Sequence, residues 1–175
     1  VEPGDLPVAY ALTLYGAPLN GWSAMWVAAE GILYALVERR RSWTATPQRN
    51  DLEIVSMAAD QRDNLWLVDA AGDVHRRDVN GAWDWLRFPE PVVGVGGHRL
   101  TPDVWFNSET TLWHHNDGAY TDVGYDLSGF TTGAVRVDPG GRAFVPTDGG
   151  LIRVSSGRPL LLDGIRDGDQ LLTDL

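Results

Sequence analysis

The feature that most constrains this chain is a four-fold internal repeat. Each copy contains a short apolar strand with an aromatic residue at its second position, then a tight turn and a second apolar strand. The aromatic anchors follow one another at intervals of 40, 39 and 39 residues: Trp26, Trp66, Trp105 and Phe144. The 3.6-residue periodicity of an amphipathic helix is missing between these anchors, so the repeat predicts an all-β chain built from equivalent sheets.

The length of the repeat predicts the type of sheet protein. About 40 residues are needed for one four-stranded blade of a β-propeller. We therefore predict an all-β propeller segment with four blades, at about 8–47, 53–90, 92–126 and 131–163, and the start of a further blade at 164–175. In the first blade we expect an inner strand over 8–15, a turn over 16–21 and a short outer strand over 43–46. An unfinished ring exposes blade faces and strand edges, so we expect further blades or a protein partner to cover the ends.

Composition excludes several classes of function. The formal net charge is −10 and all 14 basic residues are arginines, which argues against nucleic acid as a partner and excludes lysine-dependent chemistry. With no cysteine, the chain has no disulfide, thiol nucleophile or cysteine-bound metal. The apolar runs are too short for a membrane-spanning helix, so we expect no membrane insertion. We expect a soluble protein without a cofactor, periplasmic or extracellular in preference to cytoplasmic.

Two aspartates recur at a fixed distance before the anchors. Asp60 precedes Trp66 by six residues, and Asp138 precedes Phe144 by six. A short carboxylate in this place can accept hydrogen bonds from the backbone N–H groups of the following turn. We expect this structural role for both, in preference to metal binding.

The repeats also resemble a known family. Asp60, Asn64, Leu65 and Trp66 match the propeller repeats of bacterial two-component regulators, whose pattern is close to D-x-x-G-N-L-W-x-G-T-x-x-G-L, and Gly149-Gly150-Leu151 match its later part. The chain departs from the pattern where Asp69-Ala70 and Asn107-Ser108 replace Gly-Thr. A second resemblance, to streptogramin-lyase-like propellers, is carried by Val104-Trp105-Phe106. These resemblances imply a propeller used for sensing, ligand binding or docking, but no catalytic histidine of the lyase pattern can be placed.

Three of the four candidate site residues follow the inner strand predicted at 92–97, and the fourth lies in the first predicted blade. His98 and Asp103 are the candidates for catalysis, and His98, Arg99 and Trp22 are the candidates for ligand binding. His114 and His115 are adjacent on a predicted strand and therefore point to opposite faces, which argues against joint metal binding. We predict no metal site.

Tryptophan could serve either packing or ligand stacking. We assign Trp26, Trp66 and Trp105 to the core, because burying a large side chain is worth about 1.5–3 kcal/mol without any ligand. The less securely buried tryptophans are candidates for a rim: Trp22, Trp85 and Trp113.

These observations favour a noncatalytic recognition, sensor or scaffold module that binds a small ligand or a protein at the mouth of the propeller channel. Two alternatives stay open. One is a lyase or hydrolase of the propeller type that acts through His98 and Asp103, and the other is a carbohydrate-binding lectin.

Overall fold

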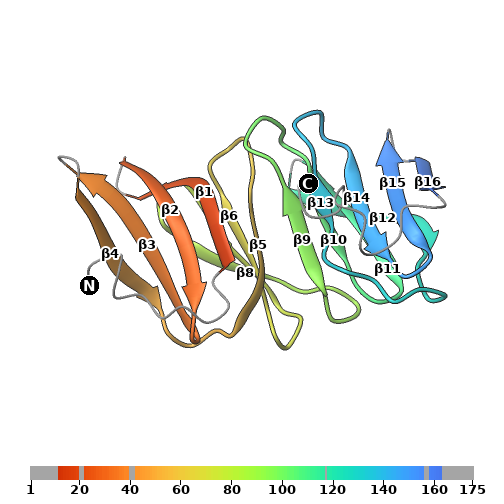
Figure 1. Ribbon diagram of the computed structural model, residues 1–175, viewed down its shortest axis with the longest axis horizontal. Helices are drawn as coiled ribbons and strands as arrows, with labels where there is room; N and C mark the ends of the chain where they lie inside the picture. The colour runs from red at the N-terminus through yellow and green to blue at the C-terminus, as the bar shows by residue number, and fades with distance from the viewer. Residues whose placement is uncertain (1–11, 20–21, 40–41, 117, 156–157, 163–175) are drawn as a thin grey trace.

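The computed structural model describes residues 12–19, 22–39, 42–116, 118–155 and 158–162. All regular secondary structure in these ranges is β-strand (Figure 1). The strands form four antiparallel sheets, each made of four consecutive strands. The first two sheets consist of β1 (Leu12–Leu19), β2 (Trp22–Ala29), β3 (Ile32–Arg39) and β4 (Ser42–Arg49), then β5 (Ile54–Ala59), β6 (Leu65–Asp69), β7 (Val74–Arg77) and β8 (Trp83–Leu86). The last two consist of β9 (Gly94–Gly97), β10 (Val104–Asn107), β11 (Thr111–Asn116) and β12 (Ala119–Asp126), then β13 (Arg136–Val137), β14 (Ala143–Thr147), β15 (Gly150–Ser155) and β16 (Arg158–Leu162).

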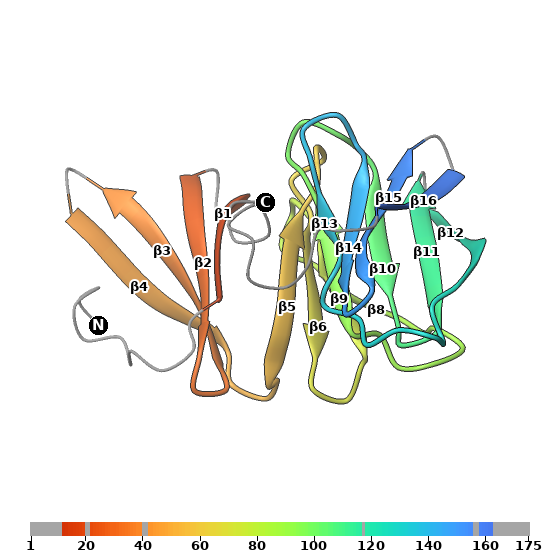
Figure 2. The same cartoon turned by 45° about the vertical axis from the view of Figure 1, so that its right-hand side comes forward.

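The sheets lie side by side in chain order, as Figures 1 and 2 show. Within each sheet the strand order follows the chain, so the first strand forms one edge and the fourth strand the other. The first strands of successive sheets contact one another, β1 with β5, β5 with β9, and β9 with β13. We call these four first strands the inner strands.

The predicted aromatic anchors occupy equivalent places on the second strand of each sheet. Trp26 and Trp66 are fully buried and Trp105 is 3% exposed, while Phe144 is half-buried. Trp26, Trp66 and Trp105 each lie between their own sheet and the next. The ring of Trp66, for example, is covered by the Arg76 guanidinium of its own sheet at 5.6 Å and by the His115 ring of the third sheet at 4.9 Å. The anchors therefore hold neighbouring sheets together, as the repeat predicts.

Glycine allows the inner strands to approach closely. A Cβ atom on Gly94 would lie 2.4 Å from Ala134 Cβ and 2.5 Å from Ala134 Cα, and a Cβ on Gly96 would lie 2.8 Å from the Val135 carbonyl oxygen. Such distances are far below van der Waals contact, so β9 fits beside the fourth sheet only without side chains at these positions. The glycine run at 94–97 is therefore a packing feature.

Buried polar side chains join the sheets along the same line. The Ser56 hydroxyl accepts a hydrogen bond from the Val95 N–H at 3.1 Å, which links the second and third sheets. Asn107, fully buried, accepts a hydrogen bond from the Val135 N–H at 2.9 Å and donates to the Gly133 carbonyl oxygen at 3.1 Å. These contacts provide hydrogen-bond partners for backbone groups where neighbouring sheets meet.

The first sheet differs from the expectation in two places. The predicted turn over 16–21 is wrong for residues 16–19, because β1 continues to Leu19. The pairing with β2 changes register between Gly16 and Leu19, so the strand accommodates this Gly-Ala-Pro sequence through an irregularity of the bulge type. The outer strand β4 is also longer than the predicted 43–46, because it pairs with β3 from Ser42 to Arg49.

Two predictions fall on residues that the structure does not describe: the beginning of the first inner strand, at 8–11, and the start of a further blade, at 164–175. In the described ranges, the chain contains no helix with the length and apolar character needed to cross a membrane.

Candidate functional site

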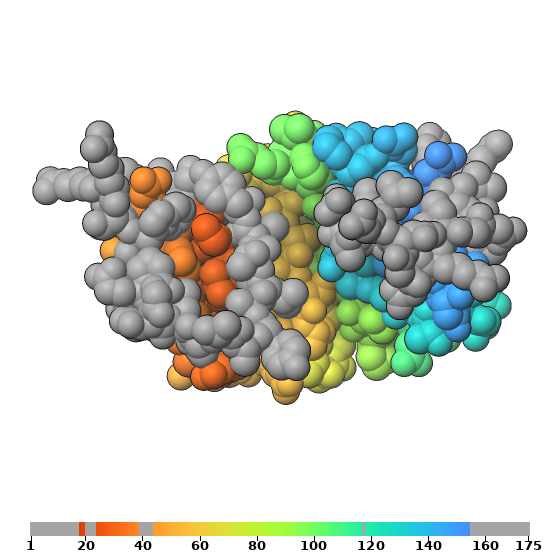
Figure 3. Space-filling model, viewed as in Figure 1, coloured from red at the N-terminus to blue at the C-terminus, as the bar shows by residue number. Residues whose placement is uncertain are grey.

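Three loops that leave the inner strands form the candidate site. They connect β5 to β6, β9 to β10 and β13 to β14, and we call residues 60–64, 98–103 and 138–142 the mouth loops. Figure 1 shows them at the same end of the sheets, and in Figure 3 the atoms near residues 100 and 140 are adjacent along the upper edge. The mouth loops thus bring together residues that are about 40 positions apart in the sequence.

The side chain of the first residue of each mouth loop stabilises the turn that follows it. Asp60, His98 and Asp138 each follow the last residue of an inner strand, and each accepts a hydrogen bond from the backbone N–H two residues later. The bonds to Asp60 and Asp138 measure 2.9 Å, and the bond from the Leu100 N–H to His98 Nδ1 measures 3.2 Å. His98 therefore replaces the aspartate of the other sheets.

Asp60 also connects its loop to the core. Oδ1 accepts from the Asn64 N–H at 3.0 Å, and Oδ2 accepts from the Asn64 side chain at 2.8 Å and from the Trp66 indole Nε1 at 2.9 Å. Both expected aspartates thus hold turns, as predicted. At Asp138, burial works to raise the carboxyl pKa, but hydrogen bonds from Arg142 and the loop backbone outweigh it and hold the pKa below its usual range.

The mouth loops also contact one another. The Gln61 N–H donates to the Thr101 carbonyl oxygen at 3.0 Å, which joins the first loop to the second. Gly141, with φ of +79°, lies so close to the second loop that a Cβ there would be 2.9 Å from Asp103 Oδ2. The three loops therefore form one surface.

Asp103 pairs with a histidine that the sequence did not assign to the site. Its Oδ1 lies 2.7 Å from His114 Nε2 on β11, and its Oδ2 accepts from the Thr101 hydroxyl at 2.5 Å. The His114 ring stacks on Trp105 with centroids 4.3 Å apart. The register of the β10–β11 hairpin could have predicted this pair. It places His114 opposite Trp105, and Trp105 is two residues after Asp103 in the sequence.

The predicted site residues take different positions at the mouth. His98 and Asp103 share a loop, but His98 bonds to the Leu100 N–H and not to Asp103, so the predicted catalytic pair does not meet in this structure. Arg99 is exposed beside Leu100, which is 62% exposed. Trp22 is the first residue of β2. The catalytic and ligand-binding roles of these residues stay predictions.

The tryptophans proposed for a rim differ from one another. Trp85 is 47% exposed, and the Arg87 guanidinium lies 4.4 Å from the centre of its ring. Trp113, in contrast, is 3% exposed because Phe88 packs against it at 5.1 Å between ring centroids. The rim prediction is therefore wrong for Trp113.

His115, on the opposite face of β11 from His114, lies at the junction of the second and third sheets against Trp66. Its Nδ1 is buried without a hydrogen-bond partner, and burial, reinforced by the Arg76 charge and opposed by Asp60, lowers the pKa of His115 below 6.5. In the unfolded chain, His115 takes up a proton below about pH 6.5, whereas in the folded chain it does so only at lower pH. The stability of the fold therefore decreases as the pH falls from about 6.5 through the lowered pKa of the folded state. We expect urea denaturation to show lower stability at pH 5.5 than at pH 7.5.

The variant His115→Phe provides the control for this pH effect. A phenyl ring can keep the edge-to-face contact with Trp66 but cannot take up a proton. The difference in stability between pH 7.5 and pH 5.5 should therefore shrink in the variant. An unchanged difference would assign the effect to other groups.

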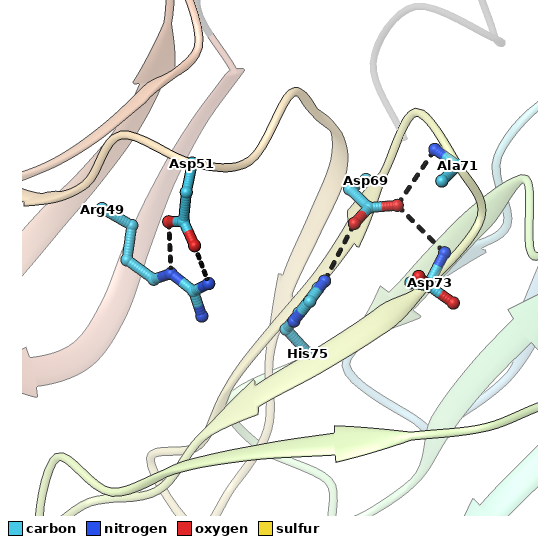
Figure 4. A network of polar contacts seen from close by, with 6 residues as sticks. All are labelled: Arg49, Asp51, Asp69, Ala71, Asp73 and His75. Atoms are coloured by element: carbon cyan, nitrogen blue, oxygen red, sulfur yellow. Dashed lines mark hydrogen bonds and ion pairs between the residues drawn. The ribbon is translucent and has the colours of Figure 1, made fainter.

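A second polar network lies at the opposite end of the second sheet (Figure 4). Asp69 Oδ1 accepts from the N–H groups of Ala71 and Asp73, both at 3.0 Å, and Oδ2 lies 2.9 Å from His75 Nε2. Nearby, hydrogen bonds between Arg49 and Asp51 raise the pKa of Arg49 and lower the pKa of Asp51. Asp69 thus holds the β6–β7 turn.

Metal binding has no support in the described ranges, where no three His, Cys, Asp or Glu side chains gather closely enough to hold an ion. The partnered carboxylates of the mouth loops are instead engaged by N–H and O–H donors.

Comparison with known proteins identifies the fold. No family model matches the sequence, and no curated protein matches it. Among solved structures, a streptogramin B lyase aligns with a TM-score of 0.63 at 13% identity, covering 87% of this chain and 58% of the lyase. Virginiamycin B lyase from Staphylococcus aureus aligns with a TM-score of 0.61 at 12% identity, covering 92% of this chain and 60% of the lyase.

A protein described as a two-component system is similar to the same degree. The extracellular domain of a protein described as a hybrid two-component system, from B. thetaiotaomicron, aligns with a TM-score of 0.61 at 20% identity, covering 86% of this chain and 22% of the other. The chain spans less than two thirds of each of these proteins, and at such identities the likeness concerns architecture alone. Four antiparallel four-stranded sheets, repeated anchors and these neighbours lead to one conclusion: the chain has the all-β fold of a β-propeller.

Proposed function

We propose that the chain is a noncatalytic recognition module of the sensor type, which binds its partner through the mouth loops. We also propose a location outside the cytoplasm, which is supported by the extracellular domain of a two-component system among the structural neighbours. The partner we favour is a protein with an acidic and apolar contact surface.

The main support for the proposal is that, within the loop of residues 98–103, some residues hold the loop in place while others are exposed to solvent. His98, Thr101 and Asp103 are engaged in hydrogen bonds that hold the loop. Arg99 and Leu100 are exposed at its tip. A rigid loop loses little conformational entropy on binding, and arginine is enriched among the residues that dominate interface energies. The arrangement therefore presents a charged and an apolar group in a fixed position.

Site-specific photo-crosslinking tests the proposal. A photoreactive phenylalanine analogue replaces Leu100 in the protein expressed in its natural host, and we expect a discrete crosslinked adduct after irradiation. The charge reversal Arg99→Glu should remove the adduct, because it repels an acidic partner. The matched control carries the same probe at Glu109, exposed on the β10–β11 turn at the other end of the same blade. Equal adducts at both positions, or none at Leu100, would contradict the proposal.

A lyase or hydrolase is the second candidate. The observation that favours it is the His114–Asp103 pair, 2.7 Å apart at the mouth, together with the lyases among the structural neighbours. A histidine held by a carboxylate can act as a general acid or base. This candidate predicts turnover of a lyase or hydrolase substrate that His114→Ala abolishes, whereas a recognition module shows no turnover to lose.

A further inference from the structure

Arg77, at the end of β7, carries a buried charge without a carboxylate partner among the residues that the structure describes. The residue is 5% exposed, and its guanidinium lies 5.2 Å from the centre of the Trp26 ring. Its NH1 group donates to two backbone oxygens at long distances, Pro18 at 3.3 Å and Asp78 at 3.4 Å. Burial lowers the pKa of Arg77, and the Asp78 charge opposes this only in part. A buried cation in such surroundings is costly unless an anion compensates it.

The guanidinium faces a cavity between the first and second blades. The cavity has a volume of about 430 Å³, and its walls come from β1, β3 and β4 on one side and from the β7–β8 hairpin on the other. Much of the cavity is lined by side chains with hydroxyl or amide groups: Thr44, Thr46, Gln48 and Asn80. Trp83 adds an aromatic side chain to the lining. Figure 2 shows β3 and β4 diverging from the second blade on this side.

The equivalent positions at the other two blade junctions carry different side chains. Register places Arg77 opposite Leu65, His115 opposite Val104, and Val154 opposite Ala143. His115 packs edge-on against Trp66, and Val154 belongs to the apolar cluster around Trp105. Covering an anchor ring therefore requires neither a guanidinium nor a cavity, so packing alone does not explain Arg77.

We propose that the cavity between the first and second blades is a binding site for a small hydroxylated carboxylate, with Arg77 as the anion-binding group. The volume falls within the range of small-molecule pockets. Guanidinium groups bind carboxylates through paired, charge-assisted hydrogen bonds. The threonine, glutamine and asparagine side chains supply partners for ligand hydroxyls. This site is separate from the mouth loops and goes beyond the function proposed for them.

Binding of sodium glucuronate to the whole chain tests the inference. We expect glucuronate to raise the melting temperature in a saturable manner at constant ionic strength, as mass action requires for a ligand that binds the folded state. Glucose, which lacks the carboxylate, and sodium sulfate, which lacks the sugar hydroxyls, should have at least tenfold weaker effects. Equal effects of sulfate and glucuronate would overturn the assignment to a hydroxylated carboxylate.

Variants locate the binding. Arg77→Met keeps an unbranched chain against Trp26 without the charge, and should weaken glucuronate binding at least tenfold in calorimetry. Thr44→Val, on the exposed wall of the cavity, should weaken it severalfold and provides a second test should Arg77→Met fail to fold. Arg87→Met, whose arginine lies on Trp85 outside the cavity, should bind glucuronate like the unmodified chain. Full binding by Arg77→Met or by Thr44→Val would overturn the proposal, and neither result bears on the photo-crosslinking at Leu100.

Discussion

Replacing Asp60 with alanine is expected to lower the free energy of unfolding by about 3–5 kcal/mol. The carboxylate accepts four hydrogen bonds, from the Arg62 and Asn64 N–H groups, the Asn64 side chain and the Trp66 indole. Trp66 is fully buried, so its indole N–H cannot turn to water when the carboxylate is removed. Urea denaturation followed by tryptophan fluorescence measures the loss.

Asp138→Ala is the matched control, at the same position of the fourth blade. Its anchor is Phe144, which has no N–H to satisfy, and its loop donors Gly140 and Arg142 are exposed. We expect a loss of about 1 kcal/mol, because these groups can bind water instead. Equal losses for the two variants would show that the indole bond of Trp66 contributes nothing to the stability of the second blade.

Gly94→Ala is expected to destabilise the chain by about 3 kcal/mol or more, at the upper end of the cost of overpacking. The added methyl group would meet both Cα and Cβ of Ala134, and the backbone can move away only by separating the third and fourth blades. That movement would also stretch the Asn107 hydrogen bond to the Val135 N–H. The same denaturation experiment measures the effect.

Gly129→Ala controls for the general effect of replacing glycine. A Cβ on Gly129 has no atom within 4 Å, and its backbone is outside the left-handed region. The variant should therefore match the unmodified chain within about 0.5 kcal/mol. A comparable loss in both variants would mean that Gly94 is not at a tight junction between blades.

The sequence predicted the parts of the fold that repeat. Regular spacing identified Trp26, Trp66 and Trp105, and the structure places all three in the core on equivalent strands. The turn role of Asp60 followed from its distance to Trp66, because a five-residue loop between paired strands fixes that distance. Local pattern sufficed for these features.

The site was harder to predict, because loop length and strand register determine it. The second mouth loop has six residues between the paired residues Gly97 and Val104, so counting back from Trp105 by six reaches Arg99 and hides the equivalence of His98 with Asp60. The Asp103–His114 pair depends on the register of β10 with β11. Trp113 is buried by Phe88 from another segment, which the local sequence does not reveal.

The central claim is that the four sheets stand side by side with their inner strands in contact, and proton NMR tests it directly. Ser56 and Val95 are 39 positions apart but share a hydrogen bond of 3.1 Å, and Asn107 and Val135 share one of 2.9 Å. The account predicts nuclear Overhauser effects from the Val95 amide proton to the Ser56 β protons and from the Val135 amide proton to the Asn107 side chain. Cross-peaks within the sheets, such as Ala58 with Trp66, without these two contacts between sheets would contradict it.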